Sequence, residues 1–257
     1  MRGIGEICFN RDAVRGVISL HPMKKLPLSL IVLSAFVFSP VVQAQEAAPA
    51  APSVEAAKLA KSDAEVEKKA AGWVASLALT DAEKAARVQA VVVTHLKAVR
   101  DWHNSHPYTA VPESIDPATG KPLTSLDRQM IADGAMPKTV HEALMSGLRK
   151  DLTVEQVEAV LDKYTEGKVA FTMKGYKAIV PDLTAEEEAK ILGFLKEARE
   201  QAVDYKSMKQ ISAIFEIYKT KSEQYLNSNG RSWKALYKAY SDKVKAEKAA
   251  KAAEQNR

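Results

Sequence analysis

The chain is almost free of cysteine. Its 257 residues include only one, Cys8, close to the N-terminus. A disulfide framework is therefore excluded, and so is catalysis by a cysteine thiolate anywhere after Cys8. The folded part of the chain must be stabilised by its hydrophobic core alone, and it is long enough to bury a sizeable one.

Several catalytic motifs are also absent. The sequence contains no Gly-x-Ser-x-Gly elbow, no glycine-rich phosphate-binding loop and no His-Glu-x-x-His. Acidic residues are abundant, but on the predicted helices they mostly alternate with lysines, as on solvated faces. A polysaccharide lyase or hydrolase that uses a pair of these carboxylates, or His103 and His106, is an alternative that no motif isolates.

The chain has no large surplus of charge outside its ends. The net charge is +5, but residues 1–44 hold five of the 37 basic and two of the 32 acidic residues. Residues 231–257 hold eight basic and three acidic residues. The positive charge therefore belongs to the C-terminal segment and not to a nucleic-acid-binding surface, so we expect no nucleic-acid partner.

The N-terminal region has the features of a secretory signal peptide. A basic start at residues 23–25 leads into an apolar stretch, which ends in the small residues of a cleavage site at Val42–Ala44. The apolar stretch is too short for a membrane span. We expect residues 1–22 to be a mis-assigned upstream extension and residues 23–44 to be removed near Ala44. The mature protein is then periplasmic or secreted, with no membrane span and no lipid anchor.

The remaining chain divides into three parts. Residues 45–61 predict a disordered Ala/Pro linker, residues 62–244 a helical domain and residues 245–257 a basic Ala/Lys tail. In the domain, apolar residues recur with the 3.6-residue period of helices, and no convincing alternation typical of strands is present. The predicted fold class is all-α, with a single compact domain of about seven to nine helices.

Two segments depart from the helical pattern. Prolines recur every five residues between Ser105 and Pro122, which predicts one long Pro-rich loop. Residues 168–183 are ambiguous, and we expect a short extended piece followed by helical turns from Met173 to Val180.

Five predicted helices begin with a capping box, in which a Ser or Thr is followed three residues later by Glu or Gln. The pairs are Ser62/Glu65, Thr80/Glu83, Thr153/Gln156, Thr184/Glu187 and Ser207/Gln210. Three of them share a Leu-Thr dipeptide, and we interpret this repeat mainly as a helix start. The strict Leu-Thr-x-x-Gln copy at residues 152–156 also resembles a motif of small periplasmic stress chaperones. A helical chaperone-like protein is therefore an alternative function.

Four histidines follow the predicted signal peptide. His103 and His106 form a His-x-x-His at the end of a predicted helix, but a zinc site needs three or four ligands. They are weak metal candidates, and we predict no metal site and no cofactor. His95 lies within an apolar helical face, which predicts a hydrogen-bonded core residue.

Six residues are candidates for contacts with a ligand. They are Trp102, His103, Tyr108, Tyr176, Arg199 and Tyr218. Arg199 lies on the apolar side of its predicted helix, where a guanidinium must pair with a carboxylate, extend to the solvent or meet a ligand, and an ion pair is the preferred interpretation. Trp102 and Tyr108 border the Pro-rich loop, and aromatic faces flanked by polar groups are typical of sugar sites.

Three stretches together resemble one bacterial family. They are Leu77–His103, Thr172–Asp204 and Ile217–Gly230, of which the second is the most specific. The family consists of exported domains of unknown function that are found beside polysaccharide-utilisation genes and whose suggested role is to bind sugars. The resemblance implies a helical fold and a carbohydrate-related role, and it supplies no catalytic residues. We therefore predict an exported accessory protein of carbohydrate utilisation that binds a glycan or oligosaccharide.

Overall fold

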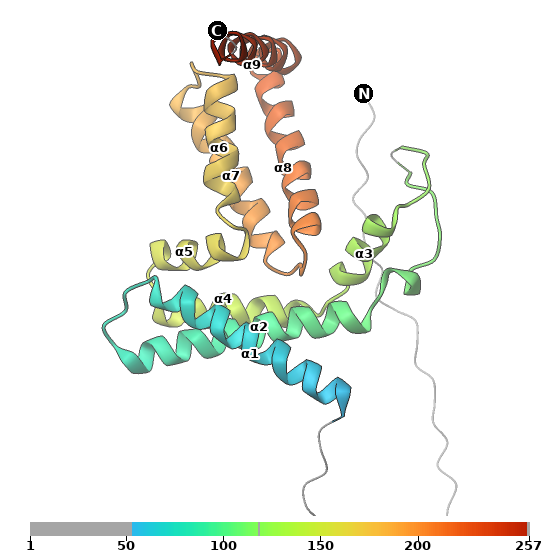
Figure 1. Cartoon of the computed structure of the whole chain (residues 1–257), viewed down its shortest axis with the longest axis vertical. Helices are drawn as coiled ribbons and strands as arrows, with labels where there is room; N and C mark the ends of the chain where they lie inside the picture. Colours follow the sequence, from blue (N-terminus) through green and yellow to red (C-terminus); the bar gives the residue numbers. More distant parts are fainter. Residues whose placement is uncertain (1–52, 118, 256–257) are drawn as a thin grey trace, which may run out of the picture. The chain divides into compact units, whose positions relative to one another are not determined.

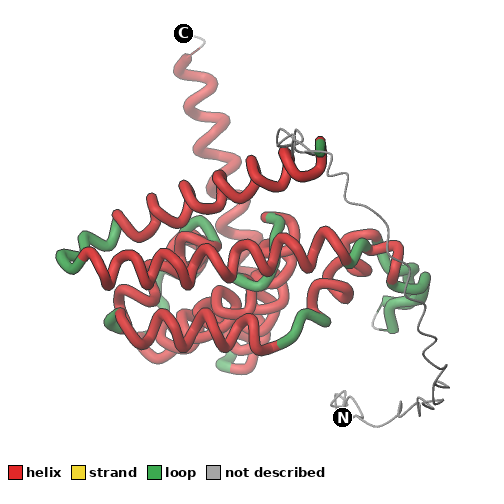
Figure 2. The backbone as a smooth tube through the Cα atoms, turned by 90° about the horizontal axis from the view of Figure 1, so that it is seen from below, coloured by secondary structure: helices red, strands yellow, loops and turns green. Residues whose placement is uncertain are grey.

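The computed structural model describes residues 53–117 and 119–255. These residues form nine α-helices and one 3-10 helix, with no strand among them, which confirms the predicted all-α fold (Figure 1; Figure 2). The predicted upstream extension, the signal peptide and the linker up to residue 52 lie outside the described residues. The helices are α1 (Val54–Ala75), α2 (Ala82–Ser105), the 3-10 helix η1 (Tyr108–Ala110), α3 (Ser125–Gly134), α4 (Lys138–Asp151), α5 (Val154–Tyr164), α6 (Lys168–Ile179), α7 (Ala185–Ala202), α8 (Met208–Ser228) and α9 (Trp233–Gln255).

Three of the predicted capping boxes are confirmed. They start α5, α7 and α8, with the pairs Thr153/Gln156, Thr184/Glu187 and Ser207/Gln210. In each pair the hydroxyl accepts a hydrogen bond from the backbone N–H of the third helical residue, whose side chain accepts one from the N-cap N–H. Both polar side chains of the strict Leu-Thr-x-x-Gln copy are thus used to start α5. This favours the helix-start interpretation of the repeat over the chaperone motif.

The predicted box of Thr80 and Glu83 is wrong. The N-cap of α2 is Asp81, whose carboxylate accepts a hydrogen bond of 3.0 Å from the backbone N–H of Lys84. Aspartate caps a helix at least as well as threonine, so two adjacent capping residues compete and the second one starts the helix.

The predicted start of α1 at Ser62 is also wrong. Ser53 is the N-cap, its hydroxyl accepts a hydrogen bond from the N–H of Ala56, and Ser62 lies in the interior of the helix. Residues 54–61, which were predicted to belong to the linker, are therefore helical. Alanine has the highest helix propensity, and the alanine-rich composition of this stretch is compatible with a helix as well as with a linker.

The ambiguous segment after Gly167 is one continuous helix. Gly167 adopts the left-handed conformation, with φ of 70°, and α6 follows it directly. The expected extended piece is wrong, because Val169, Met173 and Tyr176 recur at helical spacing and are buried in one core. Burial of this face outweighs the preference of the β-branched and aromatic residues for extended backbone.

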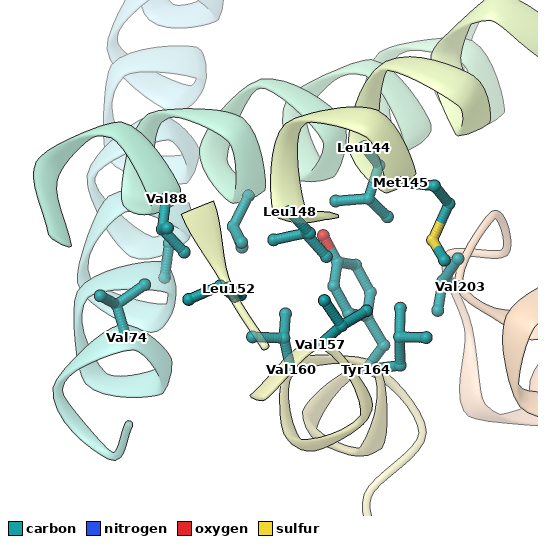
Figure 3. Close-up of a cluster of buried hydrophobic side chains, with 13 residues drawn as sticks. Val74, Val88, Leu144, Met145, Leu148, Leu152, Val157, Val160, Tyr164 and Val203 are labelled. Carbon is teal, nitrogen blue, oxygen red and sulfur yellow. The ribbon is translucent and has the colours of Figure 1, made fainter. Parts of the chain in front are cut away.

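The hydrophobic residues form two cores. Figure 3 shows the first, in which side chains of α1, α2, α4 and α5 meet Val203 from the turn after α7. The second lies among α6, α7 and α8, and Trp233 and Leu236 of α9 pack against it. The antiparallel pair of α7 and α8, which lie side by side in Figure 1, forms its largest contact.

Buried polar side chains connect the parts of the domain that hold the two cores. His95 of α2 is 2% exposed and hydrogen-bonds to Asp204, which follows α7. Asp133 of α3 is also buried, and it accepts a hydrogen bond from Gln210 of α8. Because buried polar groups are costly when unpaired, these bonds specify how the two helical groups fit together.

The close approach of α2 and α4 gives a first prediction. A Cβ added at Gly147 would lie 2.7 and 2.8 Å from the two Cγ atoms of Val91, whose χ1 is restricted in a helix. We expect Gly147→Ala to lower the free energy of unfolding by about 1–3 kcal/mol. A Cβ added at Gly193 in α7 would have no atom of the described residues within 4 Å, so Gly193→Ala should raise the free energy of unfolding by about 0.5–1 kcal/mol. Urea unfolding of both variants checks this, and stabilisation by both would contradict the close approach.

Candidate functional site

Trp102 and His103, two of the predicted contact residues, fasten α2 to α3. The indole Nε1 of Trp102 donates a hydrogen bond of 3.0 Å to the carbonyl oxygen of Ala132, and its ring stacks on His106 with a centroid distance of 3.7 Å. The Nδ1 of His103 lies 2.7 Å from Oδ2 of Asp133. These contacts give both side chains a structural role at the end of α2.

The Pro-rich loop is anchored on α3. The backbone N–H of Tyr108 donates to Oε1 of Gln129, and the guanidinium of Arg128 lies 5.5 Å from the centroid of the Tyr108 ring. Arg128 also donates two hydrogen bonds to the carbonyl oxygen of Val111. Tyr108 itself is exposed, and it does not line any of the larger hollows described below.

Arg199 connects α7 to α5. Its guanidinium is buried, with Nη1 at 2.7 Å from Oδ1 of Asp162 and Nη2 at 3.8 Å from Oε1 of Glu158. The Nε atom is buried without a hydrogen-bond partner among the described residues. The ion pair with α5 is the contact that the preferred interpretation of Arg199 predicted.

Tyr176 and Tyr218 line two different hollows. The hydroxyl of Tyr176 donates to the carbonyl oxygen of Lys219, and the ring borders a groove between α6, α8 and α9. Tyr218 borders a cleft between α4 and α7, and the ammonium of Lys221 lies 4.0 Å from its ring centroid. The six predicted contact residues are therefore spread over separate places and do not form one site.

The groove between α6, α8 and α9 is lined by aromatic rings. Its volume is about 740 Å³. The aromatic residues that line it are Phe171, Tyr176, Phe215, Trp233, Tyr237 and Tyr240. The Trp233 ring lies 5.3 Å from that of Tyr176 and 6.1 Å from that of Tyr237, with interplanar angles of 43° and 32°. Phe171 is 78% exposed and Tyr237 is 54% exposed, so part of this aromatic surface faces solvent.

The charged residues of the groove are mostly basic. Lys219 pairs with Glu216, whereas Lys168 and Lys174 form no ion pair with a carboxylate among the described residues. Glu223 also lines the groove, and burial raises its pKa above the usual value. The groove thus combines apolar ring faces with two unpaired ammonium groups.

Sequence reasoning missed this groove for identifiable reasons. Trp233, Tyr237 and Tyr240 recur at i, i+4 and i+7, a spacing that core packing also produces, yet no residue of α9 is fully buried. Phe171 lay in the segment that was expected to be partly extended. The helical face that Phe171 shares with Lys174 and Gly175 was therefore not recognised.

The cleft between α4 and α7 is acidic. It has a volume of about 570 Å³, and α3 and α8 also contribute to its walls. Glu197, Glu200 and Asp204 enter it from α7 and the following turn at positions i, i+3 and i+7. This spacing places them on one side of the helix, opposite the buried Ala198 and Ala202. The spacing is the sequence signal that would have indicated the cleft.

Two histidines share the Asp204 carboxylate. Nδ1 of His141 lies 2.9 Å from Oδ2, and Nε2 of His95 lies 3.0 Å from Oδ1. Nδ1 of His95 is 3.2 Å from the hydroxyl of Tyr164, which confirms His95 as a hydrogen-bonded core residue. The hydrogen bond to Asp204 raises the pKa of His141 above its usual value. Burial acts to raise the pKa of Asp204. Its hydrogen bonds with His141 and His95 together lower the pKa by more than burial raises it, so the pKa lies below its usual value.

Within residues 53–117 and 119–255, no group of three or more His, Cys, Asp or Glu side chains is arranged to hold a metal ion. No helix in this part of the chain is both long enough and apolar enough to cross a membrane.

Comparison with known proteins assigns the chain to a family. No curated protein matches it. A family model described as "Protein of unknown function (DUF3826)" matches residues 63–246. This range covers most of the chain and all helices from α2 to α8. The protein belongs to the DUF3826 family of proteins of unknown function.

Proposed function

We propose that the groove between α6, α8 and α9 binds a glycan, and that the protein is an exported accessory of carbohydrate utilisation. The observation that carries the proposal is the row of half-exposed and exposed rings, Phe171, Trp233 and Tyr237, in a groove with a polar rim. The C–H faces of pyranose rings stack on aromatic rings, while polar side chains bind the hydroxyl groups. Sugar binding is also what the sequence resemblance implies.

The charges of the groove favour acidic sugars. Lys168 and Lys174 form no ion pair among the described residues, so both can pair with carboxylate groups of a ligand, and the ammonium of Lys168 also lies 5.9 Å from the centroid of the Phe215 ring. The charge of Lys219 is already matched by Glu216. An ammonium group that faces a ligand carboxylate adds attraction that a neutral sugar does not gain. We therefore expect an oligogalacturonate to bind more tightly than a neutral xylo-oligosaccharide, and added salt to reduce the difference.

Export is part of the proposal. The basic start, the apolar stretch and the cleavage-site residues at positions 23–44 support it. A periplasmic or secreted protein meets oligosaccharides before they enter the cytoplasm. Cell fractionation with an antibody against the helical domain tests this step independently of glycan binding.

Two exposed rings provide the test of the groove. We expect the double variant Phe171→Ala, Tyr237→Ala to bind oligogalacturonate at least about fivefold more weakly, because each lost stacking contact costs roughly 0.5–1.5 kcal/mol. Isothermal titration calorimetry with oligogalacturonate and xylo-oligosaccharide measures the change. Both residues are largely exposed, so the fold should tolerate their replacement.

Matched controls come from exposed apolar residues outside the groove. Ile217→Ala on α8 removes a side chain that is 51% exposed, and Tyr108→Ala removes the aromatic candidate beside the Pro-rich loop. Both should bind as the unaltered protein does. The proposal is wrong if neither oligosaccharide binds, or if Tyr108→Ala weakens binding and the groove variant does not.

A further inference from the structure

The acidic cleft holds a histidine that is oriented for proton transfer. Asp204 binds Nδ1 of His141, so the proton on this nitrogen is fixed and Nε2 is the nitrogen left to exchange a proton. Nε2 lies 3.7 Å from Oε1 of Glu200, which also lines the cleft. Asp204 is in turn held by His95 from the opposite side. A histidine oriented by a carboxylate at the wall of a cleft is an arrangement suited to acid–base chemistry.

The charge of the cleft selects the type of reaction. Two lining groups can carry positive charge, the ammonium of Lys138 and the imidazole of His141. They face five carboxylates, those of Asp133, Glu142, Glu197, Glu200 and Asp204. Such a lining stabilises positive charge that develops in a transition state and opposes negative charge. Phosphoryl transfer, acyl transfer and elimination from uronates all concentrate negative charge. Cleavage of a glycosidic bond passes through an oxocarbenium-like transition state, which is positive.

We propose that this cleft hydrolyses glycosidic bonds of neutral sugars, with His141 as the general acid and Glu197 as the general base. The Nε2–H of His141 gives its proton to the glycosidic oxygen as the bond from that oxygen to the anomeric carbon breaks. A water molecule adds to the anomeric carbon and gives its proton to Glu197. One water is consumed, and transfer of the proton from Glu197 to His141 through solvent restores both groups.

The neighbours of His141 support its role as an acid. Asp204 and Glu200 raise its pKa above the usual value, so the imidazolium is present at a higher pH than for a free histidine. Glu197 forms no ion pair among the described residues, which leaves its carboxylate free to accept a proton. Tyr205 and Tyr218 also line the cleft, and burial raises the pKa of both, so they stay neutral.

The cleft activity goes beyond glycan binding in the groove and is separable from it. Tyr218 faces the cleft, whereas Phe215 and Lys219 of the same helix line the groove. Hydrolysis of small aryl glycosides in the cleft is therefore expected whether or not the groove binds a glycan, and Ile217→Ala, outside both hollows, should hydrolyse them as fast as the unaltered protein. If the groove binds no glycan, the prediction of hydrolysis in the cleft still stands. If the cleft hydrolyses nothing, the prediction of glycan binding in the groove still stands.

The test compares poor and good leaving groups. The full chain is assayed with neutral oligosaccharides of glucose, xylose and galactose in both anomeric series, and with 2,4-dinitrophenyl glycosides of the same sugars. We expect His141→Gln to lose at least about 100-fold in kcat/KM on the oligosaccharides, and to keep most activity on the dinitrophenyl glycosides. The dinitrophenolate leaves without a proton, so its departure does not need the acid.

Further variants separate chemistry from folding. Glu197→Ala should lose activity on all substrates, and added azide should restore turnover and yield a glycosyl azide. Asp204→Asn, which changes a positioning residue, should shift the high-pH limb of the rate profile to lower pH. His106→Gln, a histidine change outside the cleft, should leave all rates unchanged. Absence of hydrolysis for every substrate, or equal losses on both substrate types for His141→Gln, would overturn the proposal.

Discussion

Asp204→Ala should lower the free energy of unfolding by about 3 kcal/mol. Asp204 accepts hydrogen bonds from His95 and His141, and the side chain of His95 is only 1% exposed. Without the carboxylate, Nε2 of His95 stays buried with no acceptor, and this loss dominates the cost. Urea unfolding at pH 6 measures the change.

A neighbour of Asp204 provides the control for this prediction. Gln201→Ala removes an exposed side chain of the same cleft that forms no hydrogen bond within the described part of the chain. We expect its free energy of unfolding to stay within about 0.5 kcal/mol of that of the unaltered protein. If Asp204→Ala lowers the free energy of unfolding by less than about 1 kcal/mol, the hydrogen bonds of Asp204 with His95 and His141 do not have the structural role given to them here.

The effect of Asp204→Ala should depend on pH in a defined way. The folded-state pKa of His141 lies above its ordinary value of 6.5, so its contribution to stability is complete below that pH and is lost as pH rises through the folded-state value. The folded-state pKa of Asp204 lies below its ordinary value of 3.8, so its contribution is complete above that pH and is lost on further acidification. The difference in the free energy of unfolding between the unaltered protein and Asp204→Ala should therefore be largest between about pH 4 and 6.5.

Glu187→Ala is the second change with a large expected effect. The buried Glu187 carboxylate accepts hydrogen bonds from the backbone N–H of Thr184 and from Nε and Nη2 of Arg231. Its removal deletes a helix cap and leaves Arg231 with the exposed Asp182 as its one partner among the described residues. We expect a loss of about 3 kcal/mol in the free energy of unfolding. Glu186→Ala, an exposed carboxylate in the same first turn, is the matched control and should change it by about 0.5 kcal/mol or less.

Glu187 also connects stability to the proposed groove. Arg231 lies two residues before Trp233, where α9 begins, so loss of its partner should loosen α9 and weaken oligogalacturonate binding. The hydrogen bond from Arg231 lowers the pKa of Glu187 to about 2, well below the ordinary 4.5. The stability it contributes is therefore complete above about pH 4.5 and disappears as pH falls towards 2. Unchanged groove affinity in Glu187→Ala would show that α9 is positioned by other contacts.

Local rules predicted much of the fold. Capping boxes located the starts of α5, α7 and α8, because their hydrogen bonds involve residues only three positions apart. The same rules failed where two local options were close in energy. Asp81 competed with Thr80, and packing decided the conformation of residues 168–179.

The candidate sites depended on contacts between residues distant in the sequence. Arg199 was identified as needing a carboxylate, but its partner Asp162 lies 37 residues away. His95 was predicted as a bonded core residue, and its partner Asp204 lies 109 residues away. Periodicity shows which face of a helix is apolar and does not show which other helix covers it. The spacing of Glu197, Glu200 and Asp204 marks an acidic face of α7 in the sequence, but only the folded structure shows which helices complete the cleft and that α9 covers the groove.

The central claim is that the groove of α6, α8 and α9 is the glycan-binding surface. Backbone amide chemical-shift mapping by NMR during titration with oligogalacturonate tests it most directly. We predict that the shifted amides cluster around Phe171, Lys174 and Tyr237, with saturable changes. Clustering around Trp102 and Tyr108, or no shift at any concentration, would contradict the claim.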